Sequence, residues 1–162
     1  MSKNTRLLGV DFGKVRIGLA VCDSSRIIAS PLETYHRQSE EVDRKHFLKV
    51  IAEEDVAEIV VGLPIHLNGH EGELAQAARQ FGGWLATISK LPVTYWDERF
   101  TSSEAEQFMQ MAGLTKKKKK NRIDRVAAQI LLQSYLDAGC PKDPKIGSLD
   151  DGWTTDDRSS TR

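Results

Sequence analysis

The stretch LLGVDFGKVRIGLAVC, residues 7–22, decides the fold, because two apolar runs flank a short polar segment. We interpret residues 7–10 and 17–21 as strands joined by a turn, which predicts an antiparallel hairpin. Asp11 ends the first apolar run. A carboxylate crowded against apolar surface loses hydration that costs several kcal/mol to remove, so it persists where a cation, a metal or hydrogen bonds compensate it.

The chain outward from this hairpin alternates between strand-like and helical spacing of its apolar residues. Residues 26–29 could add a third antiparallel strand, ended by Ser30 and Pro31 because proline cannot donate to a sheet ladder. The remaining pattern predicts strands at 57–61 and 93–96, and helices at 40–54, 71–88, 102–111 and 124–138. The expected fold class is α/β, with a central mixed five-stranded sheet, three antiparallel strands then two parallel, flanked by helices.

Length and composition limit the organisation and the class of protein. A chain of 162 residues with 40% hydrophobic content suits one compact domain, which we place at residues 1–140. Residues 141–162 are polar and have little to bury, so we expect a disordered tail. No apolar stretch is long enough to span a membrane and the start lacks a secretory signal, which predicts a cytoplasmic protein. We expect Cys22 and Cys140 to be reduced thiols.

Acidic residues in three separate contexts are the candidate catalytic and metal-binding groups. Asp11 ends the first strand, Asp97 and Glu98 end another, and Asp124 opens the last predicted helix. If they converge, hard carboxylate oxygens would select Mg²⁺ or Mn²⁺. Other roles are open: Asp124 could be only a helix cap, and Asp11 could pair with Arg16. Asp97 competes with Glu98, because side chains alternate across a strand and only one can face the site.

Basic residues near these acids are candidate contacts to nucleic acid, although the formal net charge is zero. A lysine run between helices is usually a solvated loop, but this one leads directly to Asp124 and would place positive charge beside the proposed metals. The predicted nucleic-acid-binding residues are Lys14, Arg16, Arg99, Lys116, Lys117, Lys118, Lys119, Lys120, Arg122 and Arg125.

Glycine, histidine and tryptophan residues give weaker signals. Gly13 and Gly18 would permit a turn whose backbone N–H groups approach a phosphate, although simple hairpin geometry also explains them. The segment 62–70 follows a strand end and could border the site, but its histidines are more typical of a surface loop. Trp84 and Trp96 lie on a predicted helix and strand, which favours packing over base stacking.

Four motifs carry a resemblance to a known family. They are DFGKVRIGLAVCD at 11–23, IVVGLPIHLNGHEG at 59–72, DERFTSSEA at 97–105 and IDRVAAQILLQSYLD at 123–137. Their order and spacing resemble the YqgF family, also called RuvX, which is similar to Holliday-junction resolvases and is associated with pre-16S ribosomal RNA processing. The resemblance implies an RNase H-like fold and a nuclease site in which Asp11, Glu98 and Asp124 are the catalytic metal ligands. It favours Glu98 over Asp97.

The principal hypothesis is therefore a metal-dependent nuclease that hydrolyses phosphodiester bonds, acting in 5′-end processing of pre-16S ribosomal RNA. The alternatives are a resolvase of branched DNA and a non-catalytic nucleic-acid-binding module. Actin-like ATPases and sugar kinases also begin with a strand carrying DxGxxxxG, but they generally need two such domains and this chain is too short for both. The expected partner is structured RNA or branched DNA, bound by a monomer or homodimer.

Overall fold

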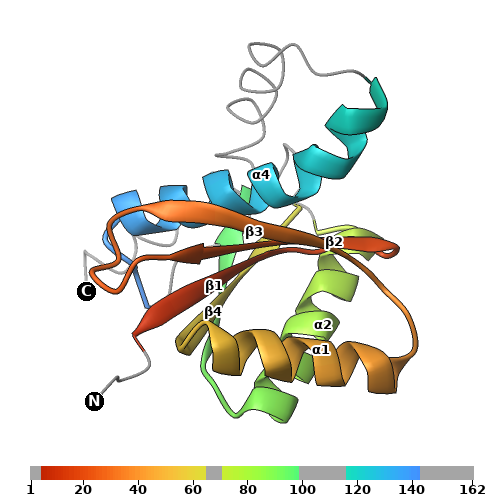
Figure 1. Cartoon of the computed structure of the whole chain (residues 1–162), viewed down its shortest axis with the longest axis horizontal. Coiled ribbons are helices and arrows are strands. Elements are labelled where there is room, and N and C mark those ends of the chain that lie inside the picture. The colour runs from red at the N-terminus through yellow and green to blue at the C-terminus, as the bar shows by residue number, and fades with distance from the viewer. Residues whose placement is uncertain (1–4, 65–70, 99–115, 143–162) are drawn as a thin grey trace, which may run out of the picture.

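The computed structural model of the chain describes residues 5–64, 71–98 and 116–142. One sheet of strand order β3-β2-β1-β4-β5 runs through it, with α1 and α2 on one face and α4 on the other (Figure 1). The first three strands pair antiparallel, β4 runs parallel to β1, and β5 runs parallel to β4, which confirms the predicted mixed sheet. The elements are β1 Arg6–Asp11, β2 Arg16–Cys22, β3 Ala29–His36, α1 Glu40–Glu53, β4 Val56–Leu63, α2 Glu73–Ser89, β5 Val93–Asp97 and α4 Lys116–Asp137.

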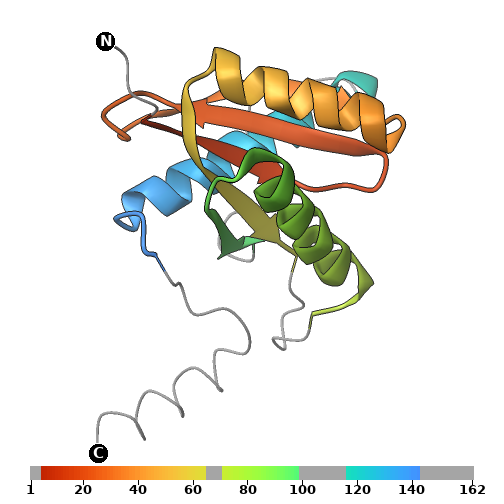
Figure 2. The ribbon, with the colours of Figure 1, turned by 90° about the horizontal axis from the view of Figure 1, so that it is seen from below.

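The two faces of the sheet carry separate hydrophobic cores. Side chains of a strand alternate between faces, so Leu8 and Val10 of β1 pack in the core under α1 and α2, whereas Leu7 packs under α4. Seen from below, α1 and α2 lie across the sheet on the same side (Figure 2). Phe12 continues the core under α1 and α2. Asp11 shares the parity of Leu7, and its side chain therefore belongs to the α4 face.

The two helices on the lower face begin close to their predicted positions. The Ser39 hydroxyl accepts a hydrogen bond from the Val42 N–H at 3.2 Å, which caps the first turn of α1. Helix α2 starts after Gly72 and ends at Lys90, whose φ of 61° is the left-handed conformation that commonly stops a helix. The apolar spacing therefore located both helices to within two residues.

The third antiparallel strand exists, but the prediction was wrong about residues 26–28, which precede it, and about Ser30 and Pro31, which lie inside it. The Asp23 carboxylate accepts hydrogen bonds from the N–H groups of Ile27 and Ile28 at 2.7 and 3.0 Å, so this segment forms a turn. Strand β3 starts at Ala29 and contains Pro31. Because β3 is an edge strand and Pro31 is exposed, the missing N–H lies where no neighbour needs it.

The last helix also differs from the prediction. Helix α4 begins at Lys116, so the lysine run is helical backbone and not a loop, and Asp124 lies inside the helix and is not its cap. Lysine and arginine are good helix formers, so the basic residues before Asp124 gave no physical reason for the helix to start only at Asp124. The predicted helix 102–111, the segment 65–70 and the tail from 143 lie outside the described residues. Within the described ranges, no helix is long and apolar enough to cross a bilayer.

Candidate active site

The carboxyl ends of three neighbouring strands bring Asp11 and Glu98 to one edge of the sheet. Strands β1, β4 and β5 are parallel, and β4 pairs with Asp97 through Leu63 and with Val10 through Val61. Asp11 is the last residue of β1, and Glu98 follows β5 directly. The two acids are 87 positions apart in sequence, yet they lie on either side of the end of β4.

The carboxyl groups of Asp11 and Glu98 form a hydrogen-bonded acid pair. Burial raises the pKa of Asp11 well above its usual value, and the charge and hydrogen bond of Glu98 and the charge of Asp124 raise it further. Burial also raises the pKa of Glu98 to about 7, with a smaller contribution from Asp97, while the hydrogen bond from Asp11 lowers it. The pair therefore retains a proton near neutral pH, donated by Asp11 to Glu98.

Gly62 of β4 provides the space that Glu98 occupies. A Cβ at Gly62 would lie 2.6 Å from Glu98 Oε2 and 2.8 Å from its Cγ, closer than such atoms approach. Any larger residue would push the Glu98 side chain away from Asp11. The sequence interpretation treated the Gly-Leu-Pro segment as the start of a loop and missed this role. The short β-branched run before a lone glycine was the available signal, because glycine in a strand often marks a close approach.

Asp124 reaches the same edge from α4 but is engaged by Arg16. Arg16 Nε donates to Asp124 Oδ2 at 2.7 Å, so the pairing of Arg16 with Asp11 that the sequence allowed does not occur. Asp124 is still close enough to raise the pKa of Asp11 by its charge. The structure thus brings the three predicted acids together as a contacting pair and a neighbour. Among the described side chains, no group of three or more His, Cys, Asp or Glu residues is already arranged to hold a metal ion.

The remaining predicted site residues divide by position. Lys14 is exposed in the turn after β1, and Arg125 is half-buried beside Asp124 on α4. Asp97 is 2% exposed, and its neighbour Glu98 contacts Asp11; the choice of Glu98 over Asp97 as a metal ligand stays a prediction. Gly18 lies in β2 opposite Asp11, where the backbone of α4 passes over it, and not in the turn. Arg99 lies outside the described residues, as do the side chains of Lys116, Lys117, Lys118, Lys119, Lys120 and Arg122.

The acid pair predicts an unusual dependence of stability on pH. Between the usual carboxyl pKa of 4.5 and about 7, the folded protein binds more protons than the unfolded chain, so the free energy of unfolding should fall as pH rises. We expect the metal-free protein to lose roughly 1–3 kcal/mol from this pair between pH 5 and 8. Urea unfolding in the presence of a chelator measures it. Because burial raises the pKa of both carboxyl groups, the double variant Asp11→Asn/Glu98→Gln should remove most of this loss, and a pH slope equal to that of the wild type would contradict the shared proton.

Comparisons with known proteins agree with the motif resemblance. The family model RuvX, described as Holliday junction resolvase, matches residues 5–138. A protein of Rhodopirellula baltica named "Putative pre-16S rRNA nuclease" is 44% identical over 133 residues, covering 82% of this chain and 77% of that protein. One of the same name from Protochlamydia amoebophila is 41% identical over 146 residues, covering 85% and 97%.

Two solved resolvases share the fold at low sequence identity. Thermus thermophilus RuvC, in complex with a Holliday junction substrate, superposes with a TM-score of 0.55 at 17% identity, covering 90% of this chain and 99% of that one. The Fowlpox virus resolvase, in complex with Holliday junction DNA, gives 0.52 at 10% identity, covering 84% and 99%. The fold is therefore RNase H-like, as expected, and the chain belongs to the RuvX family.

Proposed function

We propose that this chain is a metal-dependent nuclease that processes the 5′ end of pre-16S ribosomal RNA in the cytoplasm. The observation that carries the proposal is the half-buried Asp11–Glu98 pair at the carboxyl ends of β1 and β5, with Asp124 close to it on α4. Curated relatives at about 40% identity carry the name of a pre-16S rRNA nuclease, which supports the choice of substrate.

The acid pair suits a hard divalent cation. When two half-buried carboxyl groups are in contact, ionising both costs free energy, which is why the pair keeps a proton. A dication would replace that proton and compensate both charges, and all donors would be oxygens, as Mg²⁺ and Mn²⁺ prefer. We expect Asp11, Glu98 and Asp124 to hold it.

The side chains of the site would divide the work of phosphodiester hydrolysis. When bound, the metal would stabilise the negative charge that develops on the attacking and leaving oxygens. Arg16 holds the Asp124 carboxylate in place through the 2.7 Å ion pair. Lys14, in the exposed turn beside Asp11, and Arg125, next to Asp124, can bind flanking phosphates. The helical lysine run, Lys116 to Lys120, would extend this positive charge along α4.

A cleavage panel tests the proposal. Structured pre-16S RNA, single-stranded RNA and a four-way DNA junction are incubated with the purified chain in Mg²⁺, in Mn²⁺ and in chelator. We expect cleavage of the precursor RNA in either metal and none in chelator. Binding should weaken steeply with salt, because phosphate contacts release counterions. Binding without cleavage in any condition would identify a non-catalytic module and overturn the proposal.

The DNA junction is included because the family description and both solved neighbours concern Holliday junctions. A resolvase cuts two symmetric strands and needs two paired active sites, so it acts as a dimer. Cleavage of the junction by a dimer, with the precursor RNA left intact, would replace the RNA assignment with a resolvase.

A further inference from the structure

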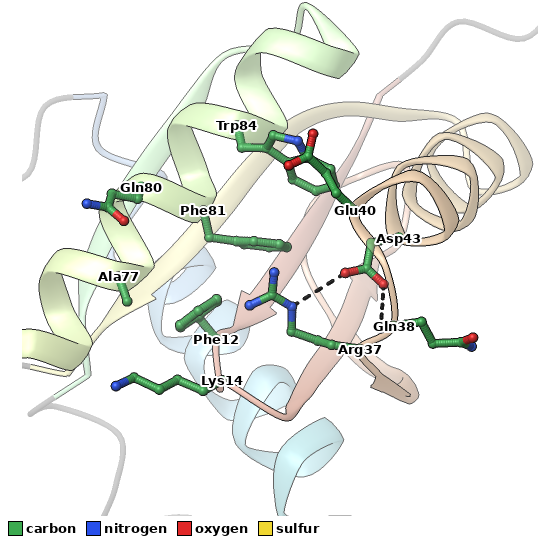
Figure 3. A pocket seen from close by; sticks show the side chains of 10 residues that line it. All are labelled: Phe12, Lys14, Arg37, Gln38, Glu40, Asp43, Ala77, Gln80, Phe81 and Trp84. Carbon is green, nitrogen blue, oxygen red and sulfur yellow. Dashed lines mark hydrogen bonds and ion pairs between the residues drawn. The ribbon is translucent and has the colours of Figure 1, made fainter.

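A pocket of about 380 Å³ opens between α1, α2 and the end of β1, on the face of the sheet opposite α4 (Figure 3). Its size is at the lower end for a small-molecule site, enough for one nucleotide but not for a duplex. We call it the Arg37 pocket. Its walls combine aromatic rings with groups of both charges: Phe12, Lys14, Arg37, Glu40, Phe81 and Trp84.

Arg37 is held in a fixed position by a buried carboxylate. Asp43 is 1% exposed, and its Oδ1 accepts hydrogen bonds from the Tyr35 hydroxyl at 2.6 Å and from the Gln38 N–H at 2.9 Å. Its Oδ2 lies 3.5 Å from Arg37 Nε, an ion pair without the geometry of a hydrogen bond. Within the described part of the chain, the terminal nitrogens of Arg37 donate to no other residue. They are therefore available to a ligand.

Aromatic rings form the walls around this guanidinium. Arg37 Cζ lies 5.5 Å from the centre of the Phe12 ring and 5.3 Å from that of Phe81. Figure 3 shows the guanidinium beside both rings. Trp84 is half-buried, and its ring centre is 5.4 Å from that of Phe81 at an interplanar angle of 34°. A flat ligand entering the pocket would meet the Trp84 and Phe81 rings and the donors of Arg37 together.

The charges of the pocket favour a neutral aromatic ligand over a bare phosphate. Arg37 and Lys14 contribute two positive charges, and Asp43 and Glu40 contribute two negative ones. A nucleobase stacks on aromatic side chains whatever its sequence. Guanine also presents two acceptors on one edge, O6 and N7, which an arginine fork can bind together. Glu40 at the pocket wall can accept from a base amino group.

The position of the pocket links it to the acid pair. Phe12 follows Asp11 directly, so the two side chains point to opposite faces at the same end of β1. The turn between β1 and β2 is connected to the pocket by a backbone hydrogen bond, in which the Arg37 N–H donates to the Val15 carbonyl at 2.9 Å. An RNA strand bound at Asp11 on the α4 face would reach the pocket by passing around this end of β1, where Lys14 is exposed.

We propose that the Arg37 pocket binds one unpaired nucleobase of the RNA strand, guanine by preference, on the opposite face of the sheet from the acid pair. This rests on the proposed nuclease function for its substrate, but the pocket can be tested without cleavage. It would make the enzyme select a site with a flipped or unpaired base, as single-stranded RNA recognition commonly does.

In the first test, the metal-free protein is titrated with each of the four nucleoside monophosphates. The NMR signal of the Trp84 indole N–H is recorded at each point of the titration. We expect GMP to shift this signal and to bind about tenfold more tightly than CMP or UMP. Inorganic phosphate and ribose 5-phosphate should leave it unchanged. An equal shift from ribose 5-phosphate would show an anion site, and no shift with any nucleotide would show that the pocket is structural; either result overturns the proposal.

The second test compares the affinities of the Arg37→Met and Lys45→Met variants for a single-stranded RNA, measured in the absence of metal. Lys45 pairs with Glu41 on the exposed side of α1 and lies outside the pocket, so its substitution removes the same charge elsewhere. We expect about tenfold weaker binding for Arg37→Met and nearly wild-type binding for Lys45→Met. Equal losses would mean that only net charge matters, against the proposal. If Arg37→Met fails to fold because Asp43 loses its partner, Arg37→Lys and the titration of the wild-type protein still decide.

The two proposals fail in distinguishable ways. Cleavage of RNA without any nucleotide response at Trp84 would overturn the pocket and leave the nuclease. Guanine binding at Trp84 in a protein that cuts no nucleic acid would retain the pocket as a base-binding site and overturn the nuclease.

Discussion

Asp11→Asn is expected to lower metal-dependent cleavage at least about a hundredfold, because loss of even an outer partner of a metal ligand commonly costs 10–100-fold. Asp11 is hydrogen-bonded to Glu98, and the charge of Asp124 raises its pKa. Its carboxylate therefore lies near both other acids and would be central to an ion that all three share. An asparagine keeps the size of the side chain and can still donate to Glu98. RNA binding should be retained, since replacing the protonated Asp11 by asparagine leaves the charge beside the phosphates unchanged in the metal-free protein. Cleavage assays and metal-free binding assays on the same preparation measure the two effects.

Asp137→Asn is the matched control for this variant. It makes the same change at an exposed position at the end of α4. Within the described residues, the Asp137 side chain accepts a hydrogen bond from Gln133 and from no other residue. It should cleave like the wild type. Unchanged cleavage by Asp11→Asn would point to a contaminating nuclease. A parallel loss in both variants would exclude a specific role for Asp11.

The sequence predicted the sheet well because its signals are local. Apolar runs and the glycine-bearing turn located β1 and β2, and short β-branched runs located β4 and β5. The errors fall where a distant neighbour decides the structure. Pro31 is tolerated because β3 is an edge strand. The start of α4 is an error of another kind, because lysine is a good helix former and a charged run does not by itself predict a loop.

In the candidate site, too, local motifs predicted which residues take part, whereas contacts between distant residues were not predicted. Motif resemblance identified the three acids and favoured Glu98, and the structure brings Glu98 against Asp11. The sequence did not reveal that Arg16 would engage Asp124, because 108 positions separate them, and the only partner it suggested for Arg16 was the nearby Asp11. Arg37 carried no signal at all. Its importance arises only where α1, α2 and the end of β1 meet, and the preference for packing at Trp84 overlooked that a half-buried ring can also line a pocket.

Gly18→Ala is expected to lower the free energy of unfolding by about 3 kcal/mol, at the upper end of the cost of overpacking. A Cβ at Gly18 would lie 1.8 Å from the Asp124 carbonyl oxygen and 2.2 Å from its carbonyl carbon. Both are backbone atoms of α4, so no side-chain rotation can relieve the clash and the helix itself must move away from β2. Because Asp124 lies on the displaced segment, cleavage should fall together with stability. Urea unfolding and the cleavage assay check the two effects.

Gly83→Ala separates this steric effect from the general consequence of adding a methyl group. Gly83 is exposed on α2, and a Cβ there meets nothing within 4 Å. Alanine is the better helix former, so this variant should gain roughly 0.5–1 kcal/mol and cleave normally. Cleavage rates are then compared per amount of folded protein, at low substrate concentration. A lower rate for Gly18→Ala on this basis would reflect the displacement of Asp124 and not a loss of folded protein. If Gly18→Ala instead matches the wild type in stability and cleavage, α4 does not press on β2 at this point, and the placement of Asp124 beside the acid pair is wrong.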